Sequence, residues 1–165
     1  NFLIDDNILN TIADSLDNES TNVIEIGPGL GSLTRKLVTR YEKVLAYEID
    51  PKMIEAAEAN RKQTHYPELS QFVCANAEDF VITDQDCFYF FNPFSVEILQ
   101  SVIGKIIKSY YRDLRRMQLF FYYPSDEYIS YLMTVPELYF VDEVDCSDLF
   151  LGNNKRERIL IFEIL

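Results

Sequence analysis

A strand that runs into three closely spaced glycines constrains this chain more than any other feature. Residues 23–26 place apolar side chains around Glu25, as a buried strand does, and glycines follow at positions 27, 29 and 31. Ser32 to Arg40 continues with helical spacing, so the glycines are predicted to form a strand-to-helix turn. Glycine adopts positive φ and lets the backbone pass close to a ligand. Because a helix start presents free N–H groups, this turn is predicted to hold an anionic group.

The spacing of the glycines distinguishes two kinds of cofactor site. The pattern here is G-x-G-x-G, with Glu25 two positions before the first glycine, whereas dinucleotide-binding folds use G-x-G-x-x-G. It resembles motif I of the class I S-adenosylmethionine (SAM) methyltransferases. The resemblance implies that the anion is the methionine carboxylate of SAM and that the cofactor site includes Glu25, Gly27, Gly29 and Gly31. A nicotinamide-dependent oxidoreductase is an alternative that the spacing disfavours.

The rest of the chain alternates between predicted strands and helices. Strands are expected at 22–26, 43–49, 69–74, 86–91, 117–123, 138–144 and 158–165, and helices at 5–16, 32–40, 50–62, 95–110 and 126–133. Alternating strands and helices that end in two consecutive strands indicate an α/β fold with a mainly parallel sheet. Residues 1–165 are expected to form a single domain.

The methyltransferase resemblance extends this prediction to a topology. It implies a Rossmann-like, seven-stranded sheet in the order 3-2-1-4-5-7-6, with strand 7 antiparallel and helices on both faces. The closing pair of strands is a feature that dinucleotide-binding dehydrogenases lack. In such sheets ligands bind beyond the carboxyl ends of the strands, and the remaining motifs of this chain fall at those ends.

Polar residues follow the second and third predicted strands. A carboxylate at Glu48 is suited to accept both ribose hydroxyls of an adenosine group, although a surface acid beside Asp50 is the alternative. By resemblance, the Asn76 side chain would accept from the adenine amino group and the backbone N–H of Ala77 would meet a ring nitrogen. Asn76 is equally well suited to a plain turn, so both interpretations stay open.

The fourth strand is followed by Asn92-Pro93-Phe94, which resembles motif IV of amino-group methyltransferases. The resemblance implies that Asn92 and the adjacent carbonyl orient the N–H groups of a target amine while the aromatic ring stacks on a flat base. Neither a metal nor a strong base is needed, because the leaving group is a neutral thioether and alignment supplies much of the rate. The alternative is that Asn-Pro merely ends a strand. The motif is one residue shorter than the Asn-Leu-Pro-Tyr form.

Three segments together resemble one family, the rRNA adenine N6-dimethyltransferases: Asn1-Phe2-Leu3-Ile4-Asp5, Val23 to Gly31, and Ala46-Tyr47-Glu48-Ile49-Asp50. The resemblance covers roughly residues 1–60. It implies that Asn1, Leu3, Ile49 and Asn92 join the cofactor site and that the acceptor is an amino nitrogen of rRNA adenine.

The C-terminal half is more similar to small, functionally unassigned bacterial class I methyltransferases, and we expect the basic helical RNA-binding domain of the rRNA enzymes to be missing. A chimeric or engineered origin is therefore a hypothesis. The corresponding alternative function is a SAM-binding domain with little or no turnover.

The charge of the chain weighs against autonomous RNA binding. The net charge is −12, whereas proteins that grip nucleic acid alone show a basic face. Each of two basic clusters is either a solvated surface, the favoured interpretation, or a phosphate track: Lys105, Lys108, Arg112, Arg115 and Arg116, and Lys155, Arg156 and Arg158. After the fifth strand, Tyr122-Tyr123-Pro124 either lines a substrate pocket or packs against helices, and packing is favoured.

The cysteine and hydropathy patterns exclude other classes of protein. The chain has three cysteines without C-x-x-C spacing, Cys74, Cys87 and Cys146, and a single histidine, His65. This set argues against a structural zinc site and against a disulfide framework. We therefore expect a metal-free protein of the reducing cytoplasm. No apolar run approaches the roughly 20 residues that cross a bilayer, so no membrane association is expected.

Overall fold

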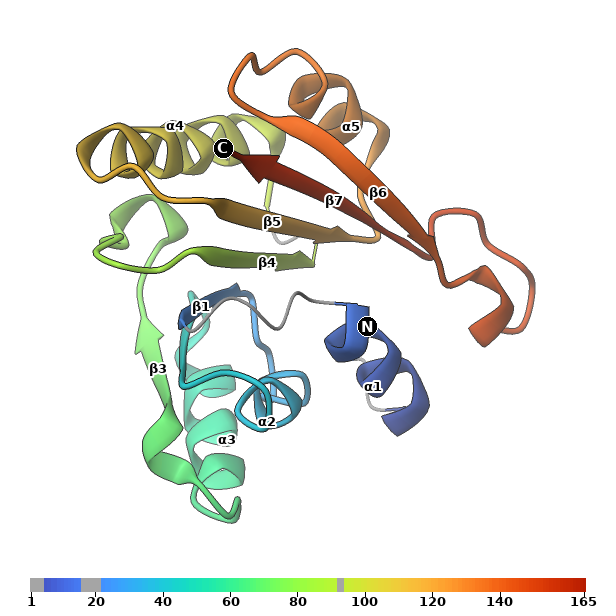
Figure 1. The fold of residues 1–165 in the computed structure, drawn as a ribbon. Helices are drawn as coiled ribbons and strands as arrows, with labels where there is room; N and C mark the ends of the chain where they lie inside the picture. Colours follow the sequence, from blue (N-terminus) through green and yellow to red (C-terminus); the bar gives the residue numbers. More distant parts are fainter. Residues whose placement is uncertain (1–4, 16–21, 92–93) are drawn as a thin grey trace. The chain divides into compact units, whose positions relative to one another are not determined.

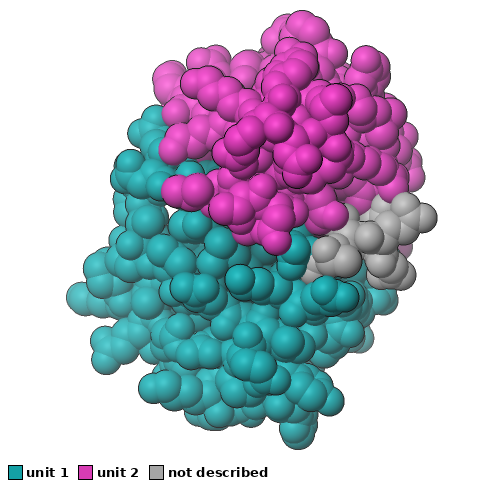
Figure 2. Space-filling view, turned by 60° about the vertical axis from the view of Figure 1, so that its left-hand side comes forward, with its two compact units in different colours: residues 1–80 teal, residues 81–165 magenta. Residues whose placement is uncertain are grey.

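The structure is a computed structural model that describes residues 5–15, 22–91 and 94–165. Figure 1 shows the strands and helices in chain order. The chain divides into two compact units, residues 1–80 and 81–165, which Figure 2 shows in different colours. Each unit is described by itself.

Unit 1 is a parallel three-stranded sheet with three helices. In the sheet, β2 lies between β1 and β3. The elements are α1 (Asp6–Ser15), β1 (Asn22–Ile26), α2 (Thr34–Leu37), β2 (Lys43–Glu48), α3 (Pro51–Arg61), and β3 (Ser70–Cys74). Short 3-10 turns stand at Pro67–Leu69 and Ala77–Asp79.

Local chemistry explains where the helices of unit 1 begin. The Asp5 carboxylate accepts from the Asn7 N–H at 2.8 Å and caps α1, whose apolar stripe is buried. Asp50 caps α3 in the same way, accepting from the Lys52 N–H at 2.9 Å. Pro51 occupies the first turn of α3, where its missing N–H costs nothing.

The helix predicted for residues 32–40 is much shorter than expected. Only Thr34–Leu37 is α-helical, and turns flank it on both sides. A four-residue helix has almost no aligned dipole. Any attraction of an anion to this region must therefore come from individual N–H groups rather than from a macrodipole.

Unit 2 holds a four-stranded mixed sheet with an aromatic core. β4 and β5 are parallel, whereas β7 pairs antiparallel with β5 on one side and β6 on the other. Phe90 and Phe121 stack at 4.7 Å between ring centroids, and Phe162 meets Phe121 edge-on. The elements are β4 (Cys87–Phe91), α4 (Val96–Arg112), β5 (Met117–Tyr122), α5 (Asp126–Leu132), β6 (Tyr139–Asp145) and β7 (Arg158–Ile164).

The strand order of the seven-stranded sheet is β3-β2-β1-β4-β5-β7-β6. This confirms the predicted order and the antiparallel placement of the seventh strand. The single-domain organisation remains a prediction. Among the described residues, no helix is long and apolar enough to cross a membrane.

Candidate functional site

The glycine turn between β1 and α2 has a backbone that only glycine adopts without strain. Gly27, Gly29 and Gly31 have φ angles of +79°, +56° and +79°, in the left-handed region that disfavours side chains. A Cβ added at Gly31 would also lie 3.0 Å from Cζ of Phe72. The turn is fixed by bonds from the Gly27 N–H to the Tyr47 carbonyl and from the Gly31 N–H to the Pro28 carbonyl, both 2.9 Å.

The residues just beyond the turn leave backbone donors available. Within the described part of the chain, the N–H groups of Leu30, Ser32 and Leu33 have no hydrogen-bond acceptor. Unpaired N–H groups beside a glycine turn favour an anionic ligand. The donors and the open backbone together suit a carboxylate or phosphate group.

Glu48 ends β2 and points its carboxylate at this turn. One oxygen accepts from the Gly29 N–H at 3.2 Å, and the other accepts from the N–H groups of Ile49 and Asp50 at 2.9 and 3.1 Å. A carboxylate has about four acceptor sites, so capacity remains for a ligand hydroxyl. The apolar Ile49 side chain next to it is 68% exposed.

Glu25 is buried beneath the turn rather than facing solvent. Its side chain accepts from the Thr34 hydroxyl at 2.6 Å, which ties β1 to the first residue of α2. Burial raises the pKa of Glu25 to about 7, the charge of Glu48 adds to the rise, and the Thr34 hydrogen bond opposes it. Glu25 thus supports the turn from the strand side.

The residues after β3 show a turn at Asn76. The Asn76 side chain accepts from the Glu78 N–H at 3.2 Å and caps the 3-10 turn Ala77–Asp79. The turn role left open from the sequence is therefore present. A contact of Asn76 or Ala77 with adenine stays a prediction.

The predicted acceptor motif is described only at its last residue. Asn92 and Pro93 lie outside the described residues, as do Asn1 and Leu3. Phe94 is half-buried and meets Phe90 edge-on, with 6.4 Å between ring centroids.

Tyr128, in α5, holds the backbone of Phe94 and was missed from the sequence. Its hydroxyl donates to the Phe94 carbonyl at 2.6 Å and accepts from the Phe94 N–H at 3.3 Å. Burial raises the pKa of Tyr128 to about 12, so the hydroxyl keeps its proton and remains a donor. The sequence shows Tyr128 as an aromatic residue in the first turn of the helix after β5, but no nearby residue indicates that it contacts Phe94.

The two tyrosines after the fifth strand take different roles. Tyr122 is buried at the end of β5 and donates to Glu157, and its ring meets Phe91 of β4; packing of this ring against helices stays a prediction. Tyr123 is half-exposed and has a positive φ of 52°. The guanidinium carbon of Arg156 lies 4.7 Å from the centroid of its ring.

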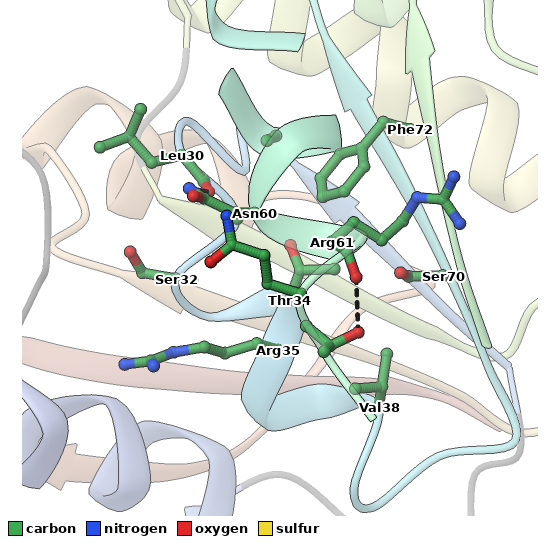
Figure 3. A pocket seen from close by; sticks show the side chains of 13 residues that line it. Leu30, Ser32, Thr34, Arg35, Val38, Asn60, Arg61, Ser70 and Phe72 are labelled. Carbon is green, nitrogen blue, oxygen red and sulfur yellow. Dashed lines mark hydrogen bonds between the residues drawn. The ribbon is translucent and has the colours of Figure 1, made fainter. Parts of the chain in front are cut away.

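A separate pocket of about 380 Å³ opens in unit 1 between α2, α3 and β3 (Figure 3). Its arginines are engaged: Arg35 pairs with Asp6, and Arg61 binds Glu58 and the Pro67 carbonyl. Of the predicted cofactor residues it shares Gly31 alone with the turn. The pocket also includes Leu30 and Ser32, whose N–H groups are among the free donors beyond the turn, so it adjoins the turn, but neither Glu25 nor Glu48 lines it.

Comparison with known proteins relates residues 1–85 to the family model described as ribosomal RNA adenine dimethylase. A ribosomal RNA small subunit methyltransferase A of Mycoplasmopsis pulmonis is 61% identical over 54 residues, covering 33% of this chain and 21% of the relative. One from Mycoplasmopsis synoviae is 36% identical over 112 residues, covering 67% of this chain and 42% of the relative. The chain spans less than half the length of either relative.

A solved structure shares the fold of almost the whole chain. The N-methyltransferase NodS from Bradyrhizobium japonicum WM9, in complex with S-adenosyl-L-homocysteine, superposes with a TM-score of 0.67 at 16% identity, covering 96% of this chain and 83% of that one. This likeness confirms the class I methyltransferase fold. The comparisons give no support to a chimeric origin, since alignment to a single relative extends over 112 residues.

Proposed function

Because this chain belongs to the ribosomal RNA adenine dimethylase family, we propose that it binds SAM and transfers the methyl group to an amino nitrogen of an RNA adenine. The observation that carries the proposal is the glycine turn with Glu48 directed at it. The family match covers these residues, whereas the activity of the much longer relatives comes to this chain only as part of the proposal.

The donor set of unit 1 fits SAM. The three glycines would let the backbone approach the methionine end, and the free N–H groups that follow them would donate to its carboxylate. Glu48 would accept from a ribose hydroxyl with its remaining acceptor site, and the exposed Ile49 side chain would cover the adenine ring. Asn1, Leu3, Asn76, Ala77 and Asn92 complete the proposed cofactor site, and Glu25 supports it through Thr34.

The acceptor residues position an amine rather than deprotonate it strongly. Bound SAM supplies a sulfonium methyl whose leaving group is a neutral thioether. As the new N–C bond forms and the S–CH3 bond breaks, the amine becomes cationic and loses one proton to solvent water, so acceptors at Asn92 and Pro93 would suffice to hold its N–H groups. Phe94 would stack on the base, and Tyr128 fixes the Phe94 backbone for that purpose.

A second candidate is a SAM-binding domain with little turnover, and the net charge of −12 favours it. Such a charge opposes the phosphate attraction on which RNA binding depends. The three described cysteines are free thiols. Free thiols fit a reducing cytoplasmic location, which both candidate functions share.

A labelled-methyl assay tests the proposed activity. The protein is incubated with methyl-labelled SAM and small-subunit ribosomal RNA, and the RNA is digested to nucleosides. Label in N6-methylated adenosine that Asn92→Ala abolishes is the expected result. Binding of S-adenosylhomocysteine without any transfer would select the second candidate, and failure to bind it would overturn both.

A further inference from the structure

One arginine of unit 2 differs from the others in what its guanidinium does. Arg112 and Arg115 donate to backbone carbonyls near the start of β4, at Ile82 and Gln85. Arg116 pairs with Glu163, and Arg158 pairs with Glu143 at 3.3 Å. Four of the five arginines in residues 81–165 are thus occupied by protein oxygens.

Arg156 is the fifth, and its guanidinium faces an aromatic ring instead. It lies 4.7 Å from the centroid of Tyr123, and within the described residues it forms no ion pair and its side chain makes no hydrogen bond. The residue is exposed, and so is the neighbouring Lys155. A guanidinium stacked on a tyrosine keeps its N–H groups free for a planar, bidentate acceptor such as phosphate.

The position of the pair is the carboxyl end of β5. Tyr123 follows β5 directly, and β5 runs parallel to β4 with Tyr122 opposite Phe91. Phe94, the described part of the acceptor motif, follows β4. Ligands of such sheets bind beyond these strand ends, so Arg156 stands at the edge where the acceptor is expected.

The loop that carries Arg156 is fastened to this edge. The Tyr123 N–H donates to the Arg158 carbonyl at 3.0 Å, and the Asn154 amide donates to the Tyr123 hydroxyl at 3.1 Å. Tyr123 is held at φ +52° and Asn153 at φ +47°. Bulky residues in this region cost roughly 1–2 kcal/mol, and such strain persists where surroundings impose it, commonly at functional sites.

The acids near Arg156 have other hydrogen-bond or ion-pair partners. The Glu157 carboxylate accepts from the Tyr122 hydroxyl, and Glu143 is paired with Arg158. Asp145 accepts from the Ser147 N–H at 2.8 Å. Lys155 and Arg156 are both exposed, and among the described residues no acid is paired with Arg156.

We propose that Arg156, stacked on Tyr123 and assisted by Lys155, binds a backbone phosphate of single-stranded RNA next to the target nucleotide. The inference rests on the proposed function and deepens it, because it names the part of the chain that contacts the acceptor strand. It also divides the second basic cluster of the sequence: Arg158 is structural, whereas Lys155 and Arg156 form the phosphate contact.

Fluorescence anisotropy with an adenine-containing single-stranded RNA tests this, in a series of salt concentrations. Removing both charges in Lys155→Gln/Arg156→Gln is expected to weaken binding about tenfold at low salt and to reduce the slope of log K against log salt by about 0.7, the value for one lost phosphate contact to a single strand. Lys108→Gln, an exposed lysine of α4, is the matched control and should leave the slope unchanged.

Two further readouts separate this proposal from others. Tyr123→Gly removes the ring but accommodates the positive φ, and it should weaken RNA binding severalfold; a thermal melt of the variant separates this loss from a loss of the fold. Affinity for S-adenosylhomocysteine should be unaffected by all these variants. An unchanged salt slope in the double variant, an equal loss in Lys108→Gln, or no RNA binding by a wild type that binds S-adenosylhomocysteine would overturn the phosphate contact alone. Failure of the wild type to bind S-adenosylhomocysteine would instead overturn the proposed function.

Discussion

In unit 1 the candidate site is made mostly of backbone, whereas in unit 2 it is made mostly of rings. The turn of unit 1 consists of three positive-φ glycines, and Glu48 accepts from three backbone N–H groups around it. In unit 2 the corresponding edge carries Phe94, Tyr123 and Tyr128, which are positioned by hydroxyl bonds and ring contacts.

This contrast follows the pattern of similarity to known proteins. The family model matches residues 1–85, which is unit 1 and the few residues after it. A site built from backbone geometry tolerates few sequences, because each positive φ favours glycine over residues with a side chain. A site built from aromatic rings at strand ends tolerates many sequences. The fold of unit 2 can therefore persist while the residues proposed to hold the acceptor change.

The largest expected effect concerns the buried carboxylate that supports the turn of unit 1. The pKa of Glu25 is raised from 4.5 to about 7, so the native state keeps a proton that the unfolded chain has already lost. Stability therefore falls as pH rises from about 4.5 to about 7 and stays lower above that range. Glu25→Gln removes this titration while keeping an acceptor for Thr34.

Between pH 4 and pH 8, the stability of Glu25→Gln relative to wild type is expected to rise by about 3 kcal/mol, since each pKa unit is worth 1.36 kcal/mol. Urea unfolding at both pH values measures it. Parallel stability profiles for variant and wild type would show that Glu25 is not the buried, proton-binding support described above.

Replacing one glycine in each unit by alanine is expected to change the stability of the protein in opposite directions. Gly31→Ala places a Cβ 3.0 Å from Phe72 at φ +79° and should destabilise the protein by about 2 kcal/mol, with weaker S-adenosylhomocysteine binding. Gly104→Ala lies in α4 with nothing within 4 Å of the new Cβ, so it should stabilise by about 0.5–1 kcal/mol. Equal behaviour of the two variants would remove the special role of the turn.

The smallest expected effect on stability comes from a substitution in unit 2. Tyr128→Phe deletes the hydroxyl that bonds both backbone groups of Phe94, at a cost of about 1 kcal/mol in stability. Methyl transfer should slow while S-adenosylhomocysteine affinity stays at the wild-type value. Tyr66→Phe, at an exposed tyrosine of unit 1, is the control. A loss of cofactor affinity in Tyr128→Phe would contradict the separation of the two sites.

The sequence predicted the strands well because each depends on a local pattern, whereas the order of the sheet followed from the resemblance to class I methyltransferases. Apolar runs and glycine turns are visible in a window of ten residues, and they located β1 through β7 to within a residue or two at most ends. The short helix α2 was overpredicted, since the apolar spacing of residues 32–40 is also satisfied by turns on both sides of a single helical turn.

Contacts between distant segments were out of reach of the sequence. Tyr128 binds Phe94 across 34 positions, and Arg156 covers Tyr123 across 33 positions. Neither pairing has a local signal. The burial of Glu25 behind Thr34 likewise depends on where α2 packs, so a residue expected among the cofactor contacts supports the turn from beneath instead.

The central claim is that unit 1 holds SAM through Glu48 and the glycine turn. Calorimetric titration with S-adenosylhomocysteine tests it most directly, with a thermal melt of each variant to separate loss of the site from loss of the fold. We predict one binding site, an affinity lowered at least tenfold by Glu48→Ala, because a hydrogen bond to a charged group contributes about 1.5–3 kcal/mol, and no change in Glu55→Ala, an exposed acid of α3. Equal affinity in wild type and a folded Glu48→Ala would contradict the account.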